Sequence, residues 1–430
     1  MDKKILNELV QDQAEDKKRL LKSEGMIERE TVPFWRPLIK NELVKVTMGP
    51  RRAGKTTFTH QLLLDRPYAY INFDDEKLAY MTRNDLNDVL DSLYRTYGDF
   101  DSLLLDEVQN VDGWELFINR LQRKKLNMFI TGSNANLLSR ELATHLTGRH
   151  LKMEIFPFSF REFLTINKIS QSGASTQGKA RLIRALEEYM KIGGYPEVLR
   201  SPEIANFYLN SLFSSILSRD IISRNNIRLV KTFKELAYTL ISNFSQMTSY
   251  NKLKSIHGLK SVHTAKNYAD ALSNAYLFYF IDRISFKPKE ITNSPKKVYC
   301  IDPGMVRALA LRADEARGRL MENVVLIELM RRKAQDKAMK VYYWRDYQDH
   351  EVDFVIKRRD RVDALYQVTY ASGHDEIDAR EVAGFVKGSE ALRCKDLRLI
   401  TWDLEDEGMK NGTKYKCIPL WKWLVGTDTS

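Results

Sequence analysis

A chain of 430 residues is too long for one ordinary hydrophobic core and suggests two or three domains. Hydrophobic residues make up 43% and aromatic residues 10%, which is enough apolar surface for a globular protein and excludes a disordered one. The formal net charge of +11 favours an anionic partner, although an excess of lysine can also serve solubility alone.

The N-terminal residues 1–18 are charged and lack an apolar stretch, so we expect neither a secretory signal nor a membrane anchor. The most apolar window, 275–281, is far shorter than the roughly 18 residues that a membrane span needs. The three cysteines have no zinc-site spacing and fit reduced thiols. These features predict a cytoplasmic protein without membrane contact.

The segment 44–58 runs from a β-branched strand pattern into a glycine-bounded loop and then into a helical pattern. Its spacing satisfies G-x-x-x-x-G-K-[ST], in which backbone N–H groups turn inward around phosphate oxygens at the N-terminus of a helix. Lys55 is expected to reach the β- and γ-phosphates, and the Thr56 hydroxyl to hold Mg²⁺. ATP and Mg²⁺ are therefore the predicted cofactors. The residues predicted to bind ATP are Gly49, Pro50, Arg51, Arg52, Ala53, Gly54, Lys55, Thr56 and Thr57.

An apolar run, Ser102–Leu105, ends in Asp106 and Glu107 and suits a central parallel strand buried on both faces. Asp106 is expected to help hold Mg²⁺, and Glu107 to act as the base that orients the attacking water. An acid pair can also simply end a strand at a solvated loop. Together with strand patterns at 44–48, 68–73 and 127–132, this run predicts a parallel α/β sheet.

The strand pattern at 127–132 is followed by polar residues and a helical pattern from about Asn136. This order resembles AAA+ ATPases, in which the position after that strand carries a polar sensor for the attacking water or the γ-phosphate. Asn134 or Ser133 matches the sensor position, and either residue can also serve as the N-cap of the next helix.

The same resemblance implies an arginine finger at the end of that helix, which a neighbouring subunit inserts against the γ-phosphate. Arg149 is the first candidate and Arg140 the second. A homo-oligomer is therefore expected, while a surface arginine without this role remains the alternative.

Over 49–163 the resemblance narrows to prokaryotic AAA-type ATPases that carry a C-terminal domain of unassigned function. It rests on Gly-Pro-Arg-Arg-x-Gly-Lys, Leu-Asp-Glu-Val-Gln, Thr-Gly-Ser-Asn, Leu-Thr-Gly-Arg and Phe-Pro-Phe-Ser-Phe-Arg-Glu-Phe. The turn Gly193-Gly194-Tyr195-Pro196 also resembles this family. Helical patterns after the polar loop 169–178 are expected to form a lid over the nucleotide.

Residues 249–256 and 261–272 form two helical patterns around a glycine turn, which predicts a helix-turn-helix. The run 276–281, with Arg283, Lys287 and Lys289, is expected to form a strand pair or wing, giving a winged helix. Such a domain can also serve protein contacts alone. The residues predicted to meet DNA are Lys252, Lys254, Ser261, His263, Thr264, Lys266 and Asn267, with Lys289 in the wing.

The last third carries a helix pattern followed by three strand patterns, an order that resembles the PD-(D/E)XK nuclease fold. Glu322, Asp353 and Gln367 match its metal-binding residues. Thr369 stands where that family has a lysine, a departure that favours a domain without cleavage. Lys357 and Arg380 are candidate substitutes for the lysine, and the acids can also be ordinary strand ends.

The sequence thus predicts an α/β fold with a P-loop AAA+ parallel sheet and a helical lid, a winged helix and a PD-(D/E)XK-like α/β domain. The expected function is an ATP-hydrolysing, DNA-binding machine whose nuclease-like domain is inactive. The alternative is a nucleotide switch that acts through protein partners. The expected boundaries are 1–40 for a helical lead-in, 41–167 for the ATPase core, 168–245 for the lid, 246–292 for the winged helix and 293–430 for the nuclease-like domain.

Overall fold

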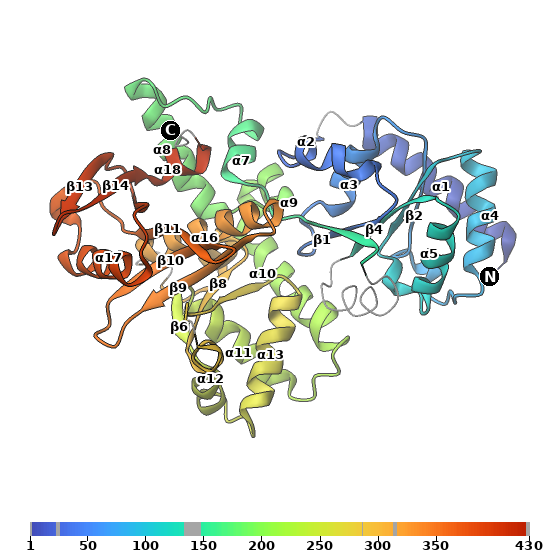
Figure 1. Ribbon diagram of the computed structural model, residues 1–430. Coiled ribbons are helices and arrows are strands. Elements are labelled where there is room, and N and C mark those ends of the chain that lie inside the picture. The colour runs from blue at the N-terminus through green and yellow to red at the C-terminus, as the bar shows by residue number, and fades with distance from the viewer. Residues whose placement is uncertain (1, 23–25, 133–147, 286, 313–315, 427–430) are drawn as a thin grey trace. The chain divides into compact units, whose positions relative to one another are not determined.

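The parallel sheet predicted for the first third of the chain is present, with strand order β2-β3-β4-β1-β5 (Figure 1). The computed structural model describes residues 2–22, 26–132, 148–285, 287–312 and 316–426. Within it the chain divides into two compact units, Met1–Phe156 and Pro157–Ser430. The first unit contains α1 (Lys3–Lys22), α2 (Val32–Trp35), η1 (Arg36–Lys40), β1 (Val44–Met48), α3 (Lys55–Leu63), β2 (Tyr68–Asn72), η2 (Glu76–Leu78), α4 (Leu86–Tyr97), β3 (Ser102–Asp106), η3 (Val108–Asn110), α5 (Trp114–Arg123), β4 (Asn127–Gly132) and β5 (His150–Glu154).

The central strands of this sheet are buried on both faces, as their apolar runs predict. All five residues of β1 and all five of β3 are buried. Phe58 and Leu62 of α3 pack with Phe129 and Leu104 of the sheet in one hydrophobic cluster. The strand ends that carry the candidate ATP-binding residues are therefore fixed by a continuous core.

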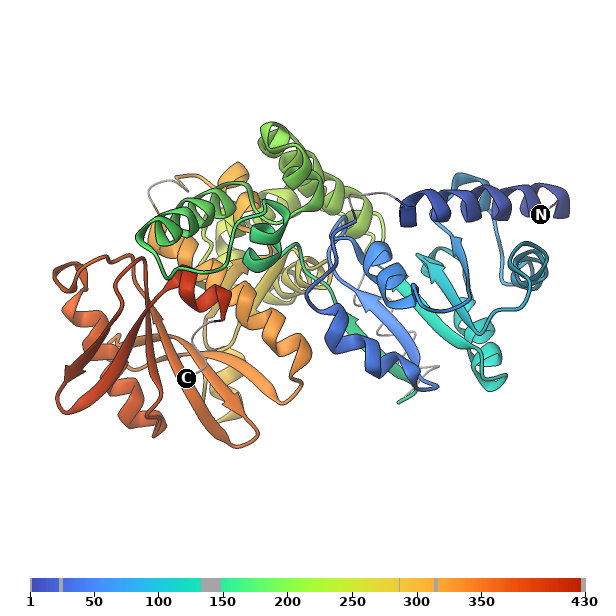
Figure 2. The same ribbon diagram turned by 90° about the horizontal axis from the view of Figure 1, so that it is seen from above.

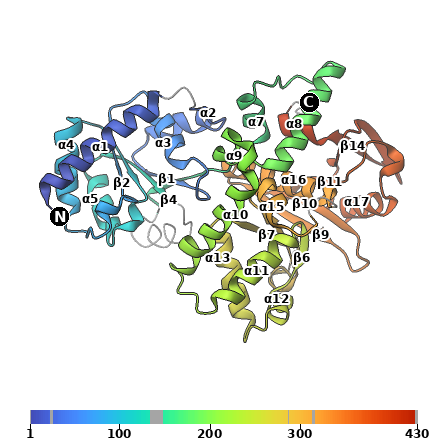
Figure 3. The same ribbon diagram turned by 180° about the vertical axis from the view of Figure 1, so that it is seen from behind.

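The lead-in helix α1 covers the edge strand β2 and contacts α4 (Figure 3). The Gln13 side chain pairs with the backbone of Asn72, donating to its carbonyl at 3.1 Å and accepting from its N–H at 2.8 Å. The Lys17 ammonium donates to the Tyr68 carbonyl at 2.8 Å. These bonds satisfy backbone groups that an exposed edge strand leaves unpaired.

The second unit combines helices with two sheets. Its elements are α7 (Phe160–Ile166), α8 (Thr176–Ile192), α9 (Pro196–Arg200), η4 (Pro202–Ile204), α10 (Ala205–Ser215), the π-helix η5 (Ile216–Ile222), α11 (Val230–Ser242), β6 (Gln246–Thr248), α12 (Tyr250–Ile256), α13 (Val262–Asn274), β7 (Phe278–Ile281), α14 (Pro288–Asn293), β8 (Lys296–Cys300), α15 (Pro303–Leu309), α16 (Arg317–Gln335), β9 (Met339–Arg345), β10 (Glu351–Arg358), β11 (Arg361–Val368), η7 (His374–Glu376), α17 (Ala379–Leu392), β12 (Leu397–Thr401), β13 (Asp406–Lys410), β14 (Thr413–Pro419) and α18 (Leu420–Val425).

The larger sheet is mixed and has six strands in the order β13-β14-β12-β11-β10-β9; its orange and red strands fan out in Figure 2. The smaller antiparallel sheet has the order β6-β8-β7. Helices α12 and α13 occupy the two predicted helical segments. The strand that pairs with β7 is β8, at 296–300, so this sheet extends past residue 292.

The family-like motifs at Phe158 and Gly194 meet inside the second unit. Phe158 N–H donates to the Gly194 carbonyl at 2.7 Å, and Gly194 N–H donates to the buried Asp302 carboxylate at 2.7 Å. Asp302 also caps α15 by accepting from Met305 N–H at 3.0 Å. The turn around Gly194 is therefore held in place by its hydrogen bonds to Phe158 and Asp302. No helix among the described residues is long and apolar enough to cross a membrane.

Candidate ATP-binding site and nuclease-like cluster

The loop between β1 and α3 has the backbone conformation that its two glycines permit. Gly49 has φ +155° and Gly54 has φ +84°, and a Cβ at Gly49 would lie 2.1 Å from the Ile155 carbonyl oxygen. Lys55, the first residue of α3, is buried and donates to the Pro50 carbonyl at 3.1 Å. The loop thus curls around the Lys55 ammonium at a helix N-terminus, a setting that favours anion binding.

The other predicted loop residues differ in exposure. Ala53 is fully buried, Arg51 and Thr57 are half-buried, and Arg52 is exposed with φ +66°. Of these four residues, Arg52 alone has a side chain that is largely exposed to solvent.

Asp106, the last residue of β3, is buried and surrounded by hydroxyl groups. Thr56 donates to its two carboxylate oxygens at 2.8 and 3.1 Å, Thr131 at the end of β4 donates to Oδ1, and the Tyr70 hydroxyl lies 3.5 Å from Oδ2. Burial raises the pKa of Asp106 to about 6, and the neighbouring Glu107 adds to this shift. The geometry brings Thr56 and Asp106 together, and both are oxygen ligands of the kind that Mg²⁺ prefers.

Glu107 has a left-handed backbone conformation, with φ 51° and ψ 37°. This is uncommon for a residue other than glycine and costs on the order of 1 kcal/mol. The Gln109 side-chain amide donates to the Glu107 carboxylate, and Glu107 N–H donates to the Thr131 hydroxyl at 3.3 Å. The strand end therefore holds Glu107 beside Asp106 in a fixed, half-buried position.

Arg29 is a residue of this site that the sequence analysis does not identify. Its side chain is only 5% exposed and donates to the Ala53 carbonyl at 3.0 Å and to the Phe156 carbonyl at 2.8 Å. Its own N–H donates to the Gln61 side chain at 3.1 Å. A charged lead-in gives no local sign of a buried arginine. Only the fold brings Arg29 to the phosphate-binding loop.

The candidate arginine finger Arg149 has an exposed side chain directly before β5. Its backbone carbonyl accepts from Val44 N–H at 3.0 Å, which fixes the start of the strand pair. The sensor candidates Ser133 and Asn134, and the second finger candidate Arg140, lie outside the described residues. Within the described part of this region, Thr131 is the polar residue that contacts Asp106.

The predicted DNA-contact residues lie on and just before α12 and α13, except Lys289, which is exposed in the short helix α14 and not in a strand of a wing. Lys252, His263, Lys266 and Asn267 are exposed, whereas Lys254 is half-buried. Four of the predicted residues contact one another locally. Ser261 accepts from the N–H of Thr264 at 3.1 Å as the N-cap of α13, and His263 Nδ1 lies 3.2 Å from the Asn267 amide nitrogen.

Glu322, Asp353 and Gln367 come together in the second unit, from α16, β10 and β11. Gln367 Oε1 accepts from Asp353 N–H at 3.2 Å. Glu322 and Asp353 share one partner, the Lys297 ammonium, at 2.9 and 2.8 Å. Lys297 belongs to β8 and is a basic group that the sequence analysis does not identify. Among the described residues, no group of three or more His, Cys, Asp or Glu is placed to hold a metal ion.

Thr369, at the position of the missing nuclease lysine, and the two candidate substitutes Lys357 and Arg380 differ in exposure. Thr369 is buried, and its N–H donates to the Ile400 carbonyl at 2.9 Å. Lys357 is half-buried near the end of β10, and Arg380 is exposed in the first turn of α17. Arg380 lines a pocket of about 590 Å³ together with Glu351, Gln367 and Glu381.

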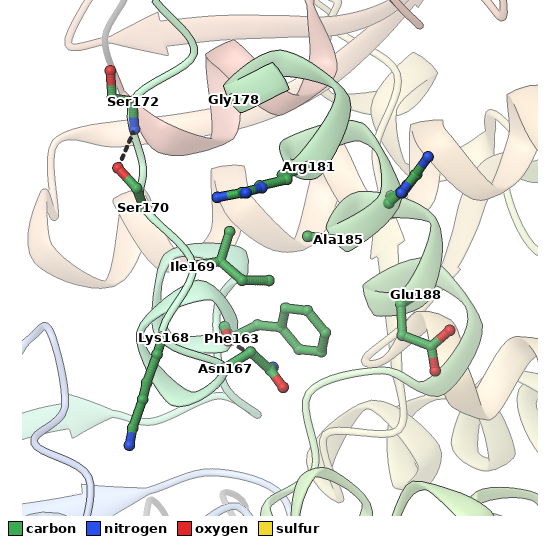
Figure 4. Close-up of a pocket in the computed structure, with 11 residues that line it drawn as sticks. Phe163, Asn167, Lys168, Ile169, Ser170, Ser172, Gly178, Arg181, Ala185 and Glu188 are labelled. Carbon is green, nitrogen blue, oxygen red and sulfur yellow. Dashed lines mark hydrogen bonds between the residues drawn. The ribbon is translucent and has the colours of Figure 1, made fainter. Parts of the chain in front are cut away.

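A second pocket, of about 410 Å³, lies between α7, the loop that follows it and the part of α8 from Gly178 to Glu188. Phe163, Ile169 and Ala185 form its apolar part, and Arg181 extends across it toward Ile169 (Figure 4). None of the predicted site residues lines this pocket.

Three family models match the chain in succession. An AAA domain matches residues 41–164, and domains of unknown function match residues 183–316 (DUF8612) and 317–423 (DUF4143). A solved structure, the Walker-type ATPase PABY2304 of Pyrococcus abyssi, is 15% identical with a TM-score of 0.45, covering 66% of this chain and 95% of its own.

Two uncharacterised proteins match most of this chain. An uncharacterised protein of Haemophilus influenzae is 29% identical over 79% of this chain and 86% of its own length. The uncharacterised Methanocaldococcus jannaschii protein MJ1544 is 34% identical over 99% of this chain and 96% of its own length. The chain therefore belongs to the family of MJ1544, and its residues 41–164 are an AAA-type P-loop ATPase domain.

Proposed function

We propose that this protein binds ATP with Mg²⁺ and hydrolyses it. One observation carries the proposal: Lys55 lies at the N-terminus of α3, while the next residue, Thr56, bonds Asp106 at 2.8 Å beside Glu107. This arrangement at one edge of a parallel sheet supports a role for Lys55 in phosphate binding, for the Thr56 and Asp106 oxygens in metal binding and for the Glu107 carboxylate, which accepts from Gln109, as the base. Magnesium bound there would neutralise charge that develops on the phosphates.

Each of these site residues then has its own role. Lys55 leaves the Pro50 carbonyl to meet phosphate oxygens, and Thr56 with Asp106 would hold the metal ion. Glu107 orients and deprotonates the attacking water, a contribution typically of about 10²- to 10⁴-fold in rate. Gln109 supports Glu107 through its side-chain hydrogen bond.

We further propose that the second unit binds DNA without sequence preference. The support is the net charge of +11 and the exposed Lys252 and Lys266 on two successive helices beside a three-stranded antiparallel sheet. Exposed lysines meet phosphates at any sequence, so this binding is electrostatic. ATP turnover would then drive work on DNA.

A nucleotide switch is the second candidate, and the Arg29 contacts favour it. One guanidinium bonds both the phosphate-binding loop at Ala53 and Phe156, the last residue of the first unit. A change in the loop on ATP binding is therefore tied to the segment that leads into the second unit. In this case ATP controls partner binding, and the basic surface is incidental.

The experiment that separates the two is the steady-state ATPase rate with and without duplex, single-stranded and branched DNA. Lys55→Ala supplies the background of contaminating ATPase. A motor predicts a rate that rises several-fold with one DNA form, whereas a switch predicts slow turnover that DNA leaves unchanged. If no turnover above the Lys55→Ala background is measured in either condition, the ATPase assignment itself is wrong.

A further inference from the structure

Lys297 of β8 is a buried lysine enclosed by carboxylates. Its side chain is 4% exposed, and its ammonium lies 2.5 Å from Glu351, 2.8 Å from Asp353 and 2.9 Å from Glu322. The Tyr299 hydroxyl, two residues along the same strand, donates to the same Glu322 oxygen at 2.5 Å. Three carboxylates from two elements therefore converge on one nitrogen atom.

The carboxylates are held in place by the fold around them. Between Val352 and Val355 the pairing of β10 with β9 shifts by one residue, a bulge of the kind that redirects side chains next to functional sites. Val352 and Val355 both join the core beneath α17, while Asp353 turns to Lys297. Asp353 also accepts from Val368 N–H at 2.9 Å.

β8 is fixed against α16 beside this cluster. The Asn323 side chain accepts from Cys300 N–H at 2.8 Å and donates to the Cys300 carbonyl at 2.9 Å. Because Asn323 follows Glu322 and Cys300 lies three residues after Lys297, these paired bonds set the distance between the ammonium and the carboxylate. The contact between Lys297 and Glu322 thus depends on the packing of β8 against α16.

Charge makes a cation at this point necessary. Buried carboxylates that face one another repel, and leaving them without a counter-charge is strongly destabilising. At 2.5 to 2.9 Å from three carboxylates, the Lys297 ammonium supplies that counter-charge.

We propose that the Lys297 ammonium is the resident cation of this cluster and occupies the place that a divalent metal ion would need. A Mg²⁺ or Mn²⁺ ion needs these oxygens at about 2.1 Å, but they already surround a nitrogen atom at hydrogen-bond distance. The two cations exclude each other. Its consequence rests on the DNA binding proposed above: a unit that holds Lys297 in place of a metal ion would bind DNA without cleaving it.

The test is Mn²⁺ binding by the nucleotide-free full chain, counted as loss of the free-ion signal in electron paramagnetic resonance. The variants are Lys297→Met, which keeps side-chain length without charge, and Lys296→Met, which removes the neighbouring lysine bonded to Asp282. Each is compared with its Asp353→Asn counterpart, so that only metal held at the cluster is counted.

We expect wild type and Lys296→Met to bind no Mn²⁺ that depends on Asp353. Lys297→Met should bind one Mn²⁺ with a Kd on the order of 10⁻⁴ M. Its melting temperature should fall by about 5 to 10 °C without metal and recover in Mn²⁺. If Lys297→Met does not fold, the double variant Lys297→Met/Glu322→Gln replaces it, because it removes one buried charge of each sign. Having lost one carboxylate, it should bind Mn²⁺ more weakly than the Kd expected for Lys297→Met.

The proposal is overturned if wild type binds Mn²⁺ in an Asp353-dependent way. The ammonium and the metal ion would then be present together, and Lys297 could serve as a catalytic lysine supplied from β8. It is also overturned if neither folded variant binds the ion. Asp353-dependent cleavage of linear, circular or branched DNA by wild type in Mn²⁺ would overturn it as well. Because these readouts use no ATP, a failure of the proposed ATPase leaves them unchanged.

Discussion

Arg29 donates a 2.8 Å hydrogen bond to the carbonyl oxygen of Phe156, the residue at which the first compact unit ends. The other arm of the same guanidinium donates to the Ala53 carbonyl inside the phosphate-binding loop. The start of the second unit is held in a similar way, because Arg331 donates to the Pro157 carbonyl at 3.0 Å and to that of Phe158 at 3.2 Å. A buried arginine therefore fixes the chain on each side of the boundary.

Replacing Arg29 with methionine should weaken ATP binding by about tenfold or more and destabilise the first unit. Two buried carbonyl groups lose their donor, which costs about 1 to 3 kcal/mol each, and about 1.4 kcal/mol is a factor of ten in affinity. Titration with a fluorescent ATP analogue and thermal unfolding measure the two effects. Arg36→Met, an exposed arginine next to the same core, is the matched control. Equal affinities in both variants would contradict the role given to Arg29.

Changing Glu107 to glutamine should leave ATP binding intact and lower turnover by about 10² to 10⁴, because the amide cannot accept the proton of the attacking water. Gln109→Ala should lower turnover less, since it removes only the hydrogen bond that supports Glu107. Single-turnover hydrolysis and nucleotide titration separate the chemical step from binding. Near-normal turnover in Glu107→Gln would show that another group serves as the base.

Asp106 should make the nucleotide-free first unit less stable as pH rises from about 4 to 6. Its pKa is raised from 3.8 to about 6, so in this window the folded state holds a proton that the unfolded state has lost. The free energy of unfolding therefore falls across this window, and above pH 6 the full loss is roughly 3 kcal/mol at most for such a shift. Asp106→Asn should unfold at higher temperature than wild type at pH 7.5 but not at pH 4, whereas the exposed Asp99→Asn should match wild type at both pH values. A gain at both pH values would exclude titration of Asp106 as its cause.

The nucleotide site follows from the sequence because its parts are local. The glycines, Lys55 and Thr56 lie within eight residues, and Asp106 with Glu107 ends an apolar run. The roles of Arg29 and Thr131 in the site cannot be predicted from the sequence, for different reasons. Arg29 stands among charged residues that resemble a solvated helix, and Thr131 looks like any residue of a short apolar strand. Only tertiary packing gives either of them a partner in the site.

The cluster of carboxylates around Lys297 shows the same limit at longer range. Glu322, Asp353 and Gln367 follow a recognisable order of helix and strands, so their approach can be predicted. Lys297 lies 56 residues before Asp353, in a strand that pairs within another sheet. Its spacing carries no motif, because the contact depends on how the two sheets join.

DNA binding by the second unit should fall steeply with salt, because each phosphate neutralised by a lysine releases about 0.9 of a counterion. Lys266→Glu should weaken binding equally to different sequences and reduce the slope of log K against log salt by about 1 or more. Fluorescence anisotropy with labelled duplexes at several salt concentrations measures both. Lys77→Glu, an exposed lysine of the first unit, makes the same charge change as a control. Binding that does not respond to salt would shift the weight to the nucleotide switch.

Arg149 is exposed directly before β5 and is the predicted arginine finger for the ATP site of a neighbouring subunit. Arg149→Ala should then lower turnover by about 10³-fold or more without changing ATP affinity, because a finger stabilises charge only in the transition state. Arg123→Ala, which removes another exposed arginine of the same unit, should keep the wild-type rate.

A mixing experiment tests whether this arginine acts between subunits. Lys55→Ala protein has no functional ATP site but retains Arg149, so in mixed oligomers it should supply the finger to the intact site of Arg149→Ala protein. The mixture should therefore regain part of the activity that both variants lack alone, at a ratio that depends on how the subunits combine. Wild-type turnover in Arg149→Ala, with no gain on mixing, would leave Arg149 as a surface residue. Loss of turnover in Arg149→Ala without rescue would instead place the arginine beside the ATP bound by its own subunit.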